Sequence, residues 1–207
     1  MKRIILIGTL ICSLHLTYAQ DISLPEPVKN GGKPLMECLA KRETSRNYDA
    51  NKQLNNQQLS NLLWAAWGYN RPDKRTAPSA RNNQEIDIYV AMKNGLYLWD
   101  AKKNILIKTL GEDIRKETAV QPNLADAPVI IILVSNKSRI KSNNNEDLIA
   151  YTYADAGYIS QNIYLFCASE NLATGVRAMF DKQKLPLKMK LKEDQMILLI
   201  HSVGYRK

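Results

Sequence analysis

The spacing of apolar residues predicts two helices in the first third of the chain. Residues 34–41 are expected to form a short helix. A second helix follows, because five apolar residues have the i, i+3, i+4, i+7, i+8 spacing of a face that packs on a core: Leu59, Leu62, Leu63, Ala66 and Trp67. Gly68 stands where this helix should end. Trp64 and Trp67 are therefore expected in the core or at an interface, and not as ligand platforms.

Shorter apolar runs predict the strands of a sheet. Residues 86–92 and 96–99 are β-prone and are joined by Lys93-Asn94-Gly95, and Asn-Gly between two such runs is a strong hairpin signal. Residues 105–110 extend this meander. Residues 128–134 and 196–200 are continuously apolar, which is typical of strands covered on both faces. We expect these last two strands at the centre of the sheet.

Residues 143–172 are apolar almost all round and predict a long buried helix. Asn143 and Glu146 have the spacing of a helix cap. Gly157 in the middle costs about 1 kcal/mol relative to alanine, so its position suggests close approach by another backbone or a ligand. Gln161 and Asn162 need partners in such an apolar helix. The elements together predict an α+β fold, with helices packed on a central, mostly antiparallel sheet.

The N-terminal residues 1–19 have the pattern of a secretory signal peptide. Two basic residues precede an apolar run, and Thr17-Tyr18-Ala19 forms a cleavage signal before Gln20. An uncleaved membrane anchor is the alternative, but the run is shorter than the roughly 20 residues that span a bilayer. Ile11 before Cys12 argues against lipid attachment. We expect an exported protein, periplasmic or secreted, without stable membrane insertion, in which an extended leader (20–33) precedes one domain (34–207).

Composition and charge exclude several classes of function. With 45% hydrophobic and 24% charged residues, the chain is neither disordered nor of low complexity. Without Lys2 and Arg3, 27 basic residues face 20 acidic ones, a net charge of +7. The basic residues are scattered without an aromatic-basic stripe, so a solvated surface is a better interpretation than nucleic-acid binding.

Histidine and cysteine are scarce after residue 19. His201 is the one histidine there, and Cys38 and Cys167 are the two cysteines. Multi-histidine and four-cysteine metal sites are thereby excluded. We expect His201 in the core or facing the sheet, and the two thiols buried separately.

Three polar clusters are candidates for binding chemistry. Residues 41–48 hold two arginines around a hydroxyl residue, a pattern that suits a phosphate, although an exposed basic loop is the plainer interpretation. Residues 75–84 form a loop of small side chains and amides before a strand, suited to the edge of a planar heteroaromatic ligand; the alternative is a set of turn-forming residues. Residues 155–162 lie inside the long helix.

The order of these motifs resembles that of the FMN-dependent nitroreductase-like family. Arg-x-[Ser/Thr]-x-Arg-x-[Phe/Tyr] is followed by a Leu-Leu-Trp-Ala-Ala helix that ends in glycine. Ala-Pro-Ser-Ala-x-Asn then precedes a strand, and Gly-x-x-x-Gln-Asn lies in the long helix. The resemblance covers residues 34 to about 205 and is closest to the branch that includes peptide-azoline dehydrogenases. It implies a nitroreductase-like α+β fold.

The resemblance also implies which residues bind FMN. Those implied for the phosphate are Arg42, Thr44 and Arg46, with Arg206 or Lys207 completing the site. Those implied for the isoalloxazine are Pro78, Ser79, Ala80, Asn82 and Gln84. The segment Arg177-Ala178-Met179 is implied against flavin N5, mainly through its backbone. The sequence departs from the family pattern at Glu43, at Gln84-Glu85-Ile86 in place of Gln-Pro-Trp, and at Met179 in place of glycine.

The function implied by the resemblance is electron transfer through flavin N5 to a nitroaromatic, quinone or similar acceptor by a ping-pong mechanism. No protein acid or base and no metal is required, because the flavin carries the chemistry. A homodimer with FMN at the subunit interface is implied. The electron donor is open, because NAD(P)H is not expected outside the cytoplasm. A non-enzymatic flavin-binding protein of the same fold is the alternative, and Arg115 is a candidate to neutralise reduced flavin.

Overall fold

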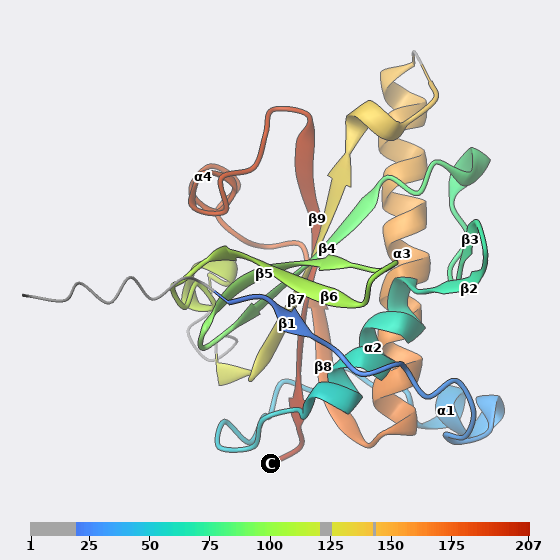
Figure 1. The fold of residues 1–207 in the computed structure, drawn as a ribbon, viewed down its shortest axis with the longest axis vertical. Helices are drawn as coiled ribbons and strands as arrows, with labels where there is room; N and C mark the ends of the chain where they lie inside the picture. The colour runs from blue at the N-terminus through green and yellow to red at the C-terminus, as the bar shows by residue number, and fades with distance from the viewer. Residues whose placement is uncertain (1–19, 121–125, 143) are drawn as a thin grey trace, which may run out of the picture.

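The structure is a computed structural model that describes residues 20–120, 126–142 and 144–207. The predicted signal peptide lies outside this part of the chain. Figure 1 shows the arrangement of the helices and strands. The strands are β1 Ile22–Ser23, β2 Tyr69–Arg71, β3 Lys74–Arg75, β4 Ile86–Met92, β5 Gly95–Asp100, β6 Ile105–Leu110, β7 Val129–Asn136, β8 Leu172–Arg177 and β9 Gln195–Tyr205. The α-helices are α1 Leu35–Lys41, α2 Asn56–Trp67, α3 Asn145–Ser169 and α4 Lys184–Lys188.

In the residues that the structure describes, the central sheet has seven strands in the order β1-β6-β5-β4-β7-β9-β8, and each strand pairs antiparallel with its neighbours. Strand β7 alternates between two cores. Val129, Ile131 and Leu133 join the core beneath α2 and α3, whereas the residues between them join the core on the opposite face. This alternation explains why the sequence of β7 is continuously apolar. The prediction of an α+β fold with a mostly antiparallel sheet is confirmed.

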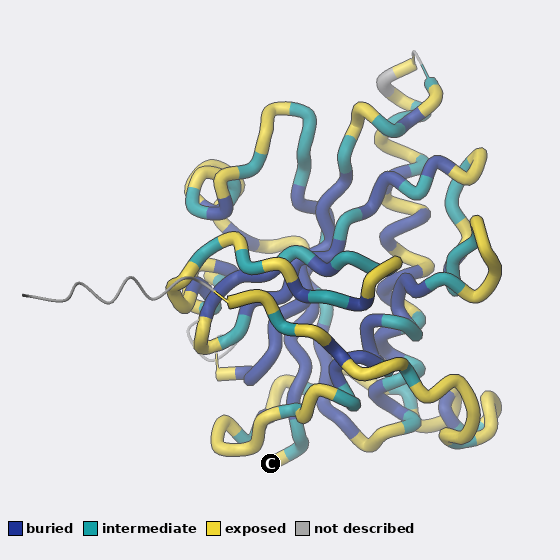
Figure 2. Tube along the Cα trace, in the orientation of Figure 1, coloured by how far each residue is buried: buried dark blue, intermediate teal, exposed yellow. Residues whose placement is uncertain are grey.

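Helices α2 and α3 pack on one face of the sheet and on each other. Asn55 caps α2 by accepting a hydrogen bond from the Gln58 backbone N–H, and Gly68 follows its last residue. Buried positions recur along α3 at intervals of three and four residues, and Figure 2 shows exposed positions alternating with them. The second core, on the far side of the sheet, includes Phe180 and Leu185. Among the described residues, no helix is long and apolar enough to cross a membrane.

Several predicted boundaries and environments need correction. The long helix is buried on one face only, since Ile149, Tyr153 and Tyr158 are 56%, 43% and 52% exposed. It ends at Ser169, and Leu172 begins strand β8. Its cap is Asn144, whose side chain accepts from the Glu146 N–H, whereas Asn143 lies outside the described residues.

Other differences concern the turns and the leader. Met92 pairs with Gly95, so the hairpin turn is Lys93-Asn94 and the glycine already belongs to β5. The 20–33 leader contains strand β1, which pairs with β6. The β2–β3 hairpin and α4 carry no apolar period in the sequence, and the sequence did not predict them.

Candidate functional site

The segment 42–46 lies against the edge strand β8. The backbone N–H of Ser45 donates to the Thr174 carbonyl at 2.9 Å. Gly175 makes this approach possible, because a Cβ there would meet Arg46 Cγ at 3.1 Å and Thr44 Cγ2 at 3.4 Å. The predicted phosphate motif is thus held on the sheet edge by its backbone.

Tyr164 of α3 supports this segment from below. Its hydroxyl accepts a hydrogen bond from the Val176 N–H at 3.1 Å and shares another with Thr44 Oγ1 at 2.9 Å. When Tyr164 donates in the second bond, the Thr44 proton is free for an outside acceptor. The Arg42 guanidinium lies 5.4 Å from the centroid of the Tyr164 ring. No local sequence pattern indicates this role of Tyr164.

Two arginines give this corner an uncompensated positive charge. Neither Arg42 nor Arg46 forms an ion pair within the described part of the chain. Arg46 donates to the Val176 carbonyl at 3.3 Å. Two guanidinium groups beside a hydroxyl donor suit a phosphate, since each can hold an anionic oxygen by a charge-assisted hydrogen bond.

The C-terminal tail, with Arg206 and Lys207, lies at the same corner. Arg206 pairs with Tyr48 in an isolated β-bridge, and the Lys207 N–H donates to the Asn47 carbonyl at 3.2 Å. The Arg206 guanidinium forms an ion pair with Glu43. Glu43, which departs from the family pattern, therefore neutralises the tail arginine.

His201 lies beneath the corner and has a structural role. It is fully buried, with Nε2 2.7 Å from Ser160 Oγ and Nδ1 3.2 Å from Thr174 Oγ1. Burial, followed by the charge of Arg177, lowers the pKa of His201 to about 3, so the imidazole is neutral at physiological pH. The prediction of a core histidine is confirmed.

A strip of the α3 surface, here named the groove, runs from Tyr164 through Gly157 to Tyr153. Tyr153, Gly157 and Tyr164 lie on one side of the helix, since the eleven residues from Tyr153 to Tyr164 make just over three whole turns and span about 16 Å. Gly157 is exposed, and a Cβ there would meet nothing within 4 Å. The predicted close approach to Gly157 is therefore not made by another described segment of this chain.

At Tyr153 this strip meets a cavity of about 370 Å³. Tyr153, Phe180, Lys182 and Met196 are among its lining residues. Just before Phe180, Ala178 and Met179 are exposed. Thus the predicted 177–179 segment lies between the arginine corner and this cavity, as a ligand that extends from phosphate to ring would require.

Within that segment, the side chain of Arg177 points inward. Its Nε donates to the Thr118 carbonyl at 3.1 Å, one terminal nitrogen to Thr118 Oγ1 at 2.9 Å and the other to Ser202 Oγ. Burial lowers its pKa to about 10, which leaves the guanidinium charged. Arg177 can therefore contribute only its backbone to a ligand in the groove.

The 78–84 loop lies on a different side of α3. The Ala80 N–H donates to the two Asp155 carboxylate oxygens at 2.9 and 3.2 Å. Asp155 and Tyr153 are two residues apart, about 200° around the helix. Figure 1 shows the segment after β3 on one side of α3 and α4 on the other. One chain therefore does not bring its 78–84 loop to its own groove.

Residues inside this loop are held by one another. Ser79 Oγ accepts from the Gln84 N–H at 3.1 Å. Gln84 accepts from Arg75 Nε at 2.9 Å and donates to the Asp73 carbonyl at 2.7 Å. Asn82 accepts from the Gln84 amide at 3.1 Å. The side chain of Gln84 is thus engaged in shaping the loop, whereas Pro78 is exposed.

A buried carboxyl pair anchors the loop. Glu85 is fully buried, and neither of its carboxylate oxygens accepts a hydrogen bond from a donor in the described residues. Burial and the neighbouring Asp155 raise the pKa of Glu85 to about 7. This carboxyl stands where the resemblance implies proline, beside the Asp155 that holds the loop through the Ala80 N–H.

Of the remaining candidates, Arg115 and Asn162 have structural partners. Arg115 forms an ion pair with Asp113 at 2.7 Å and donates to the Ala127 carbonyl, so it is not free to neutralise a flavin. Asn162 donates to the Ala66 carbonyl at 3.4 Å, whereas Gln161 is exposed. Cys38 and Cys167 are free and buried, which confirms two separate thiols. Among the described residues, no group of three or more His, Cys, Asp or Glu could hold a metal ion.

Comparison with known proteins identifies the family. The nitroreductase family model matches residues 39–205. A candidate nitroreductase from Ralstonia eutropha JMP134 is 35% identical, with 92% of this chain and 91% of that chain covered and a TM-score of 0.86. No curated protein sequence matches significantly. The chain belongs to the nitroreductase family, whose activity class is that of oxidoreductases.

Two more distant solved structures share the fold. A candidate nitroreductase from Anabaena variabilis ATCC 29413 is 19% identical, with a TM-score of 0.77; the match covers 97% of this chain and 45% of that chain. A candidate NADH oxidase from Clostridium acetobutylicum is 20% identical, with a TM-score of 0.59; the match covers 82% of this chain and 87% of that chain. The predicted nitroreductase fold is therefore confirmed.

Proposed function

We propose that this protein is an exported, FMN-dependent oxidoreductase that works as a homodimer and passes electrons to an electron-poor acceptor by a ping-pong mechanism. The observation that carries this proposal is the alignment of the arginine corner, the strip of α3 through Tyr164, Gly157 and Tyr153, and the cavity at Phe180. The strip's length of about 16 Å is of the order of an extended flavin mononucleotide. FMN, when bound, supplies two-electron redox chemistry at N5.

The chain's own residues supply binding and orientation. Arg42 and Arg46 hold the phosphate, and Thr44 donates its hydroxyl proton to it. The unfilled space at Gly157 accommodates the middle of the ligand, and the backbone of Ala178 and Met179 borders the ring. FMN fits better than FAD, because the arginine corner ends the groove with a site for one phosphate.

A second copy of the chain completes the site. In one chain, α3 separates the 78–84 loop from the groove, so the loop can line a flavin ring only across a subunit interface. Exposed apolar side chains on α1 and α3 support such an interface: Leu35, Met36, Leu39, Ile149 and Tyr158 are 61%, 75%, 44%, 56% and 52% exposed.

The absorbance spectrum of the purified protein and a stopped-flow half-reaction test this function. We expect bound FMN, and we expect chemically reduced protein to transfer electrons to a quinone or nitroaromatic faster than free reduced FMN does. This assay bypasses the unknown donor. Bound FMN without acceleration would favour the non-enzymatic flavin-binding alternative, and absence of flavin binding would contradict both.

Export and the finer branch rest on sequence alone. The basic, apolar and Thr-Tyr-Ala succession supports cleavage before Gln20, and mass spectrometry of protein from the cell envelope tests it. An intact Met1 on exported material would contradict cleavage. Membership of the peptide-azoline dehydrogenase branch stays a prediction, supported by the order of the sequence motifs.

A further inference from the structure

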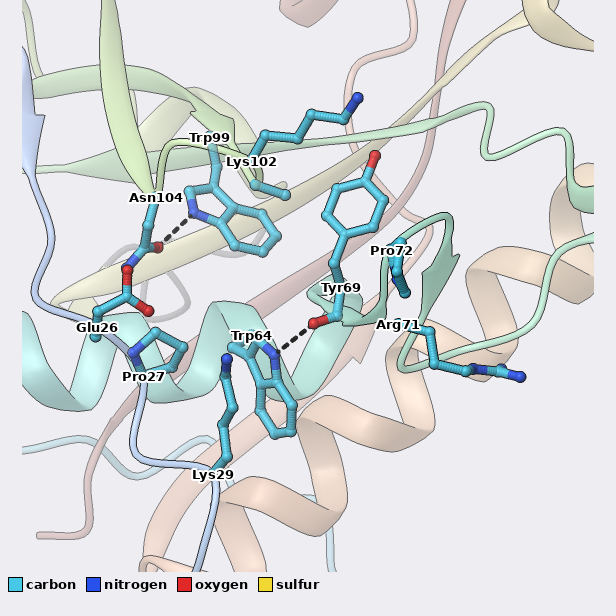
Figure 3. A pocket seen from close by; sticks show the side chains of 11 residues that line it. Glu26, Pro27, Lys29, Trp64, Tyr69, Arg71, Pro72, Trp99, Lys102 and Asn104 are labelled. Atoms are coloured by element: carbon cyan, nitrogen blue, oxygen red, sulfur yellow. Dashed lines mark hydrogen bonds between the residues drawn. The ribbon is translucent and has the colours of Figure 1, made fainter.

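A second cavity, of about 410 Å³, lies outside the proposed flavin groove. The leader, the end of α2, the β2–β3 hairpin and the β5–β6 turn surround it. Figure 3 shows three aromatic side chains in its wall, Trp64, Tyr69 and Trp99. Trp64 was expected as a core or interface residue, but it is only half-buried and lines this cavity.

The aromatic walls are fixed before any ligand arrives. Trp64 Nε1 donates to the Tyr69 carbonyl at 3.1 Å, and Trp99 Nε1 donates to Asn104 Oδ1 at 3.1 Å (Figure 3). The Asn104 amide nitrogen in turn donates to Ser60 Oγ at 2.8 Å and to the Pro25 carbonyl at 2.7 Å. Because the indole N–H groups and this amide are already used, the rings offer a ligand only apolar ring surface. This surface comes chiefly from Trp64 and Tyr69, since Trp99 is 7% exposed.

Cations surround these rings. Lys29 Nζ lies 5.9 Å from the centroid of the Trp64 ring, and Lys102 Nζ lies 5.8 Å from that of Tyr69. Arg71 is a third cation in the lining. None of the three forms an ion pair with another described residue. Glu26 is the one carboxylate among the lining residues.

Arg75 adds positive charge behind the wall. Its guanidinium lies 3.9 Å from the centroid of the Tyr69 ring and 5.1 Å from that of Trp67. It too has no ion pair within the described ranges. The cavity thus combines aromatic faces with an excess of cations over acids, an environment that attracts a negatively charged ligand.

We propose that this cavity binds a small planar aromatic acid, with one ring or a fused pair and a carboxylate or sulfonate. The ring lies between the aromatic side chains, and its anionic group faces Lys29 and Lys102. The cations in the wall repel a cationic ligand. A neutral aromatic ligand would gain binding free energy only from stacking on the rings. This site is separate from the flavin groove and does not depend on the proposed function.

Naphthalene-2-sulfonate and the uncharged naphthalene-2-sulfonamide test the proposal as a matched pair. Their binding is followed through tryptophan fluorescence, since Trp64 and Trp99 line the cavity. We expect the sulfonate to bind at least about tenfold more tightly than the sulfonamide, because two unpaired cations face it. Saturating FMN should leave its affinity unchanged.

Lys29→Ala and Lys102→Ala should each weaken sulfonate binding about three- to tenfold and leave sulfonamide binding almost unchanged. Lys103→Ala is the matched control, because Lys103 is exposed, neighbours Lys102 and does not line the cavity. The proposal is overturned if neither probe binds, if both bind equally, if Lys103→Ala weakens binding as much as Lys102→Ala, or if FMN displaces the sulfonate.

Discussion

Arg42 and Arg46 carry the phosphate part of the proposed site and permit a test at the level of single residues. Each is free of ion pairs in the described structure, and a charge-assisted hydrogen bond contributes roughly 1.5 to 3 kcal/mol. Arg42→Ala and Arg46→Ala should therefore each weaken FMN binding about ten- to a hundredfold. Titration of the flavin into each variant measures the loss.

Riboflavin, which lacks the phosphate, and Lys41→Ala are the controls for this prediction. Riboflavin affinity should fall much less in the two arginine variants. Lys41 is paired with Glu37 at 2.7 Å, so its removal should change neither titration. An equal loss for FMN and riboflavin would mean that the arginines do not contact the phosphate.

Glu85 makes the stability of the fold depend on pH. Its pKa is raised from 4.5 to about 7, chiefly by burial. The folded state therefore binds a proton that the unfolded state has lost between these values, so stability falls as pH rises from 4.5 through 7. Glu85→Gln keeps the shape without this titration. The unfolding free energy of the Glu85→Gln variant, minus that of the unchanged protein, should therefore rise by about 2 kcal/mol between pH 5 and pH 8.

Urea unfolding of both proteins across this pH range measures that difference. His201 titrates in the opposite sense, because its lowered pKa costs stability as pH falls from 6.5 toward 3. Its effect is common to both proteins and cancels in the comparison. Parallel stability curves for the two proteins would show that Glu85 is ionised in the folded state.

Residue identity alone located the arginine corner but not its support. The Arg-x-Thr-x-Arg spacing singles out Arg42, Thr44 and Arg46, because chemistry that binds phosphate is visible in residue type. Tyr164 and Gly175 act through contacts across 120 and more residues of sequence, so no local pattern indicates them. Trp64 was assigned to the core because helical periodicity does not distinguish a core face from a cavity wall.

At the scale of elements, the apolar periodicity of the sequence predicted those helices and strands whose boundaries do not depend on long-range strand pairing. The end of the helix at Gly68 and both boundaries of the strands 86–92 and 105–110 were predicted correctly. Strand β8 was partly taken as helix, because Leu172 continues the apolar character of α3. Asn171, which follows the end of α3, has a positive φ of 56°, so the helical backbone does not continue into Leu172. Pairing with β9, which the local sequence does not encode, then makes 172–177 a strand.

Gly157 gives helix α3 an element-scale test. Because a Cβ there meets nothing within 4 Å, Gly157→Ala should raise the unfolding free energy by about 0.5 to 1 kcal/mol through helix propensity. Gly157→Phe places a ring in the groove between Tyr153 and Tyr164. It should abolish FMN binding, whereas Gly157→Ala retains it. Urea unfolding and FMN titration measure the two effects.

Size-exclusion chromatography controls for damage to a subunit interface in these variants. Gly157→Phe should elute at the same volume as the unchanged protein and should unfold cooperatively. Unchanged FMN affinity in Gly157→Phe would mean that the flavin does not follow this face of α3.

At the scale of the whole molecule, the two predicted halves of the flavin site belong to different sides of one helix. The arginine corner depends on Tyr164, and the 78–84 loop depends on Asp155 through the Ala80 N–H. These two helix positions are nine residues apart, which places them half a turn apart in angle and about 13 Å apart along the axis. The order of motifs in the sequence does not reveal this separation, because it does not indicate on which side of α3 each motif packs.

The separation leads to a prediction for mixed dimers. Arg42→Ala damages the phosphate half of the site, and Ala80→Trp damages the loop half. Each variant alone should bind FMN poorly. After refolding together in equal amounts, half of the dimers are mixed, and a mixed dimer has one intact site that combines Arg42 of one subunit with Ala80 of the other. The mixture should therefore recover roughly a quarter of the normal FMN sites.

Flavin absorbance after gel filtration measures the recovered sites, and native mass spectrometry counts the mixed dimers. The unchanged protein mixed with either variant is the control for refolding yield. Mixed dimers that form in the expected proportion but bind no FMN would mean that each site lies within one subunit. In that case the 78–84 loop would have to leave Asp155 and pass around α3 to reach the groove, and the hydrogen bonds from the Ala80 N–H to the Asp155 carboxylate would be broken in the bound state.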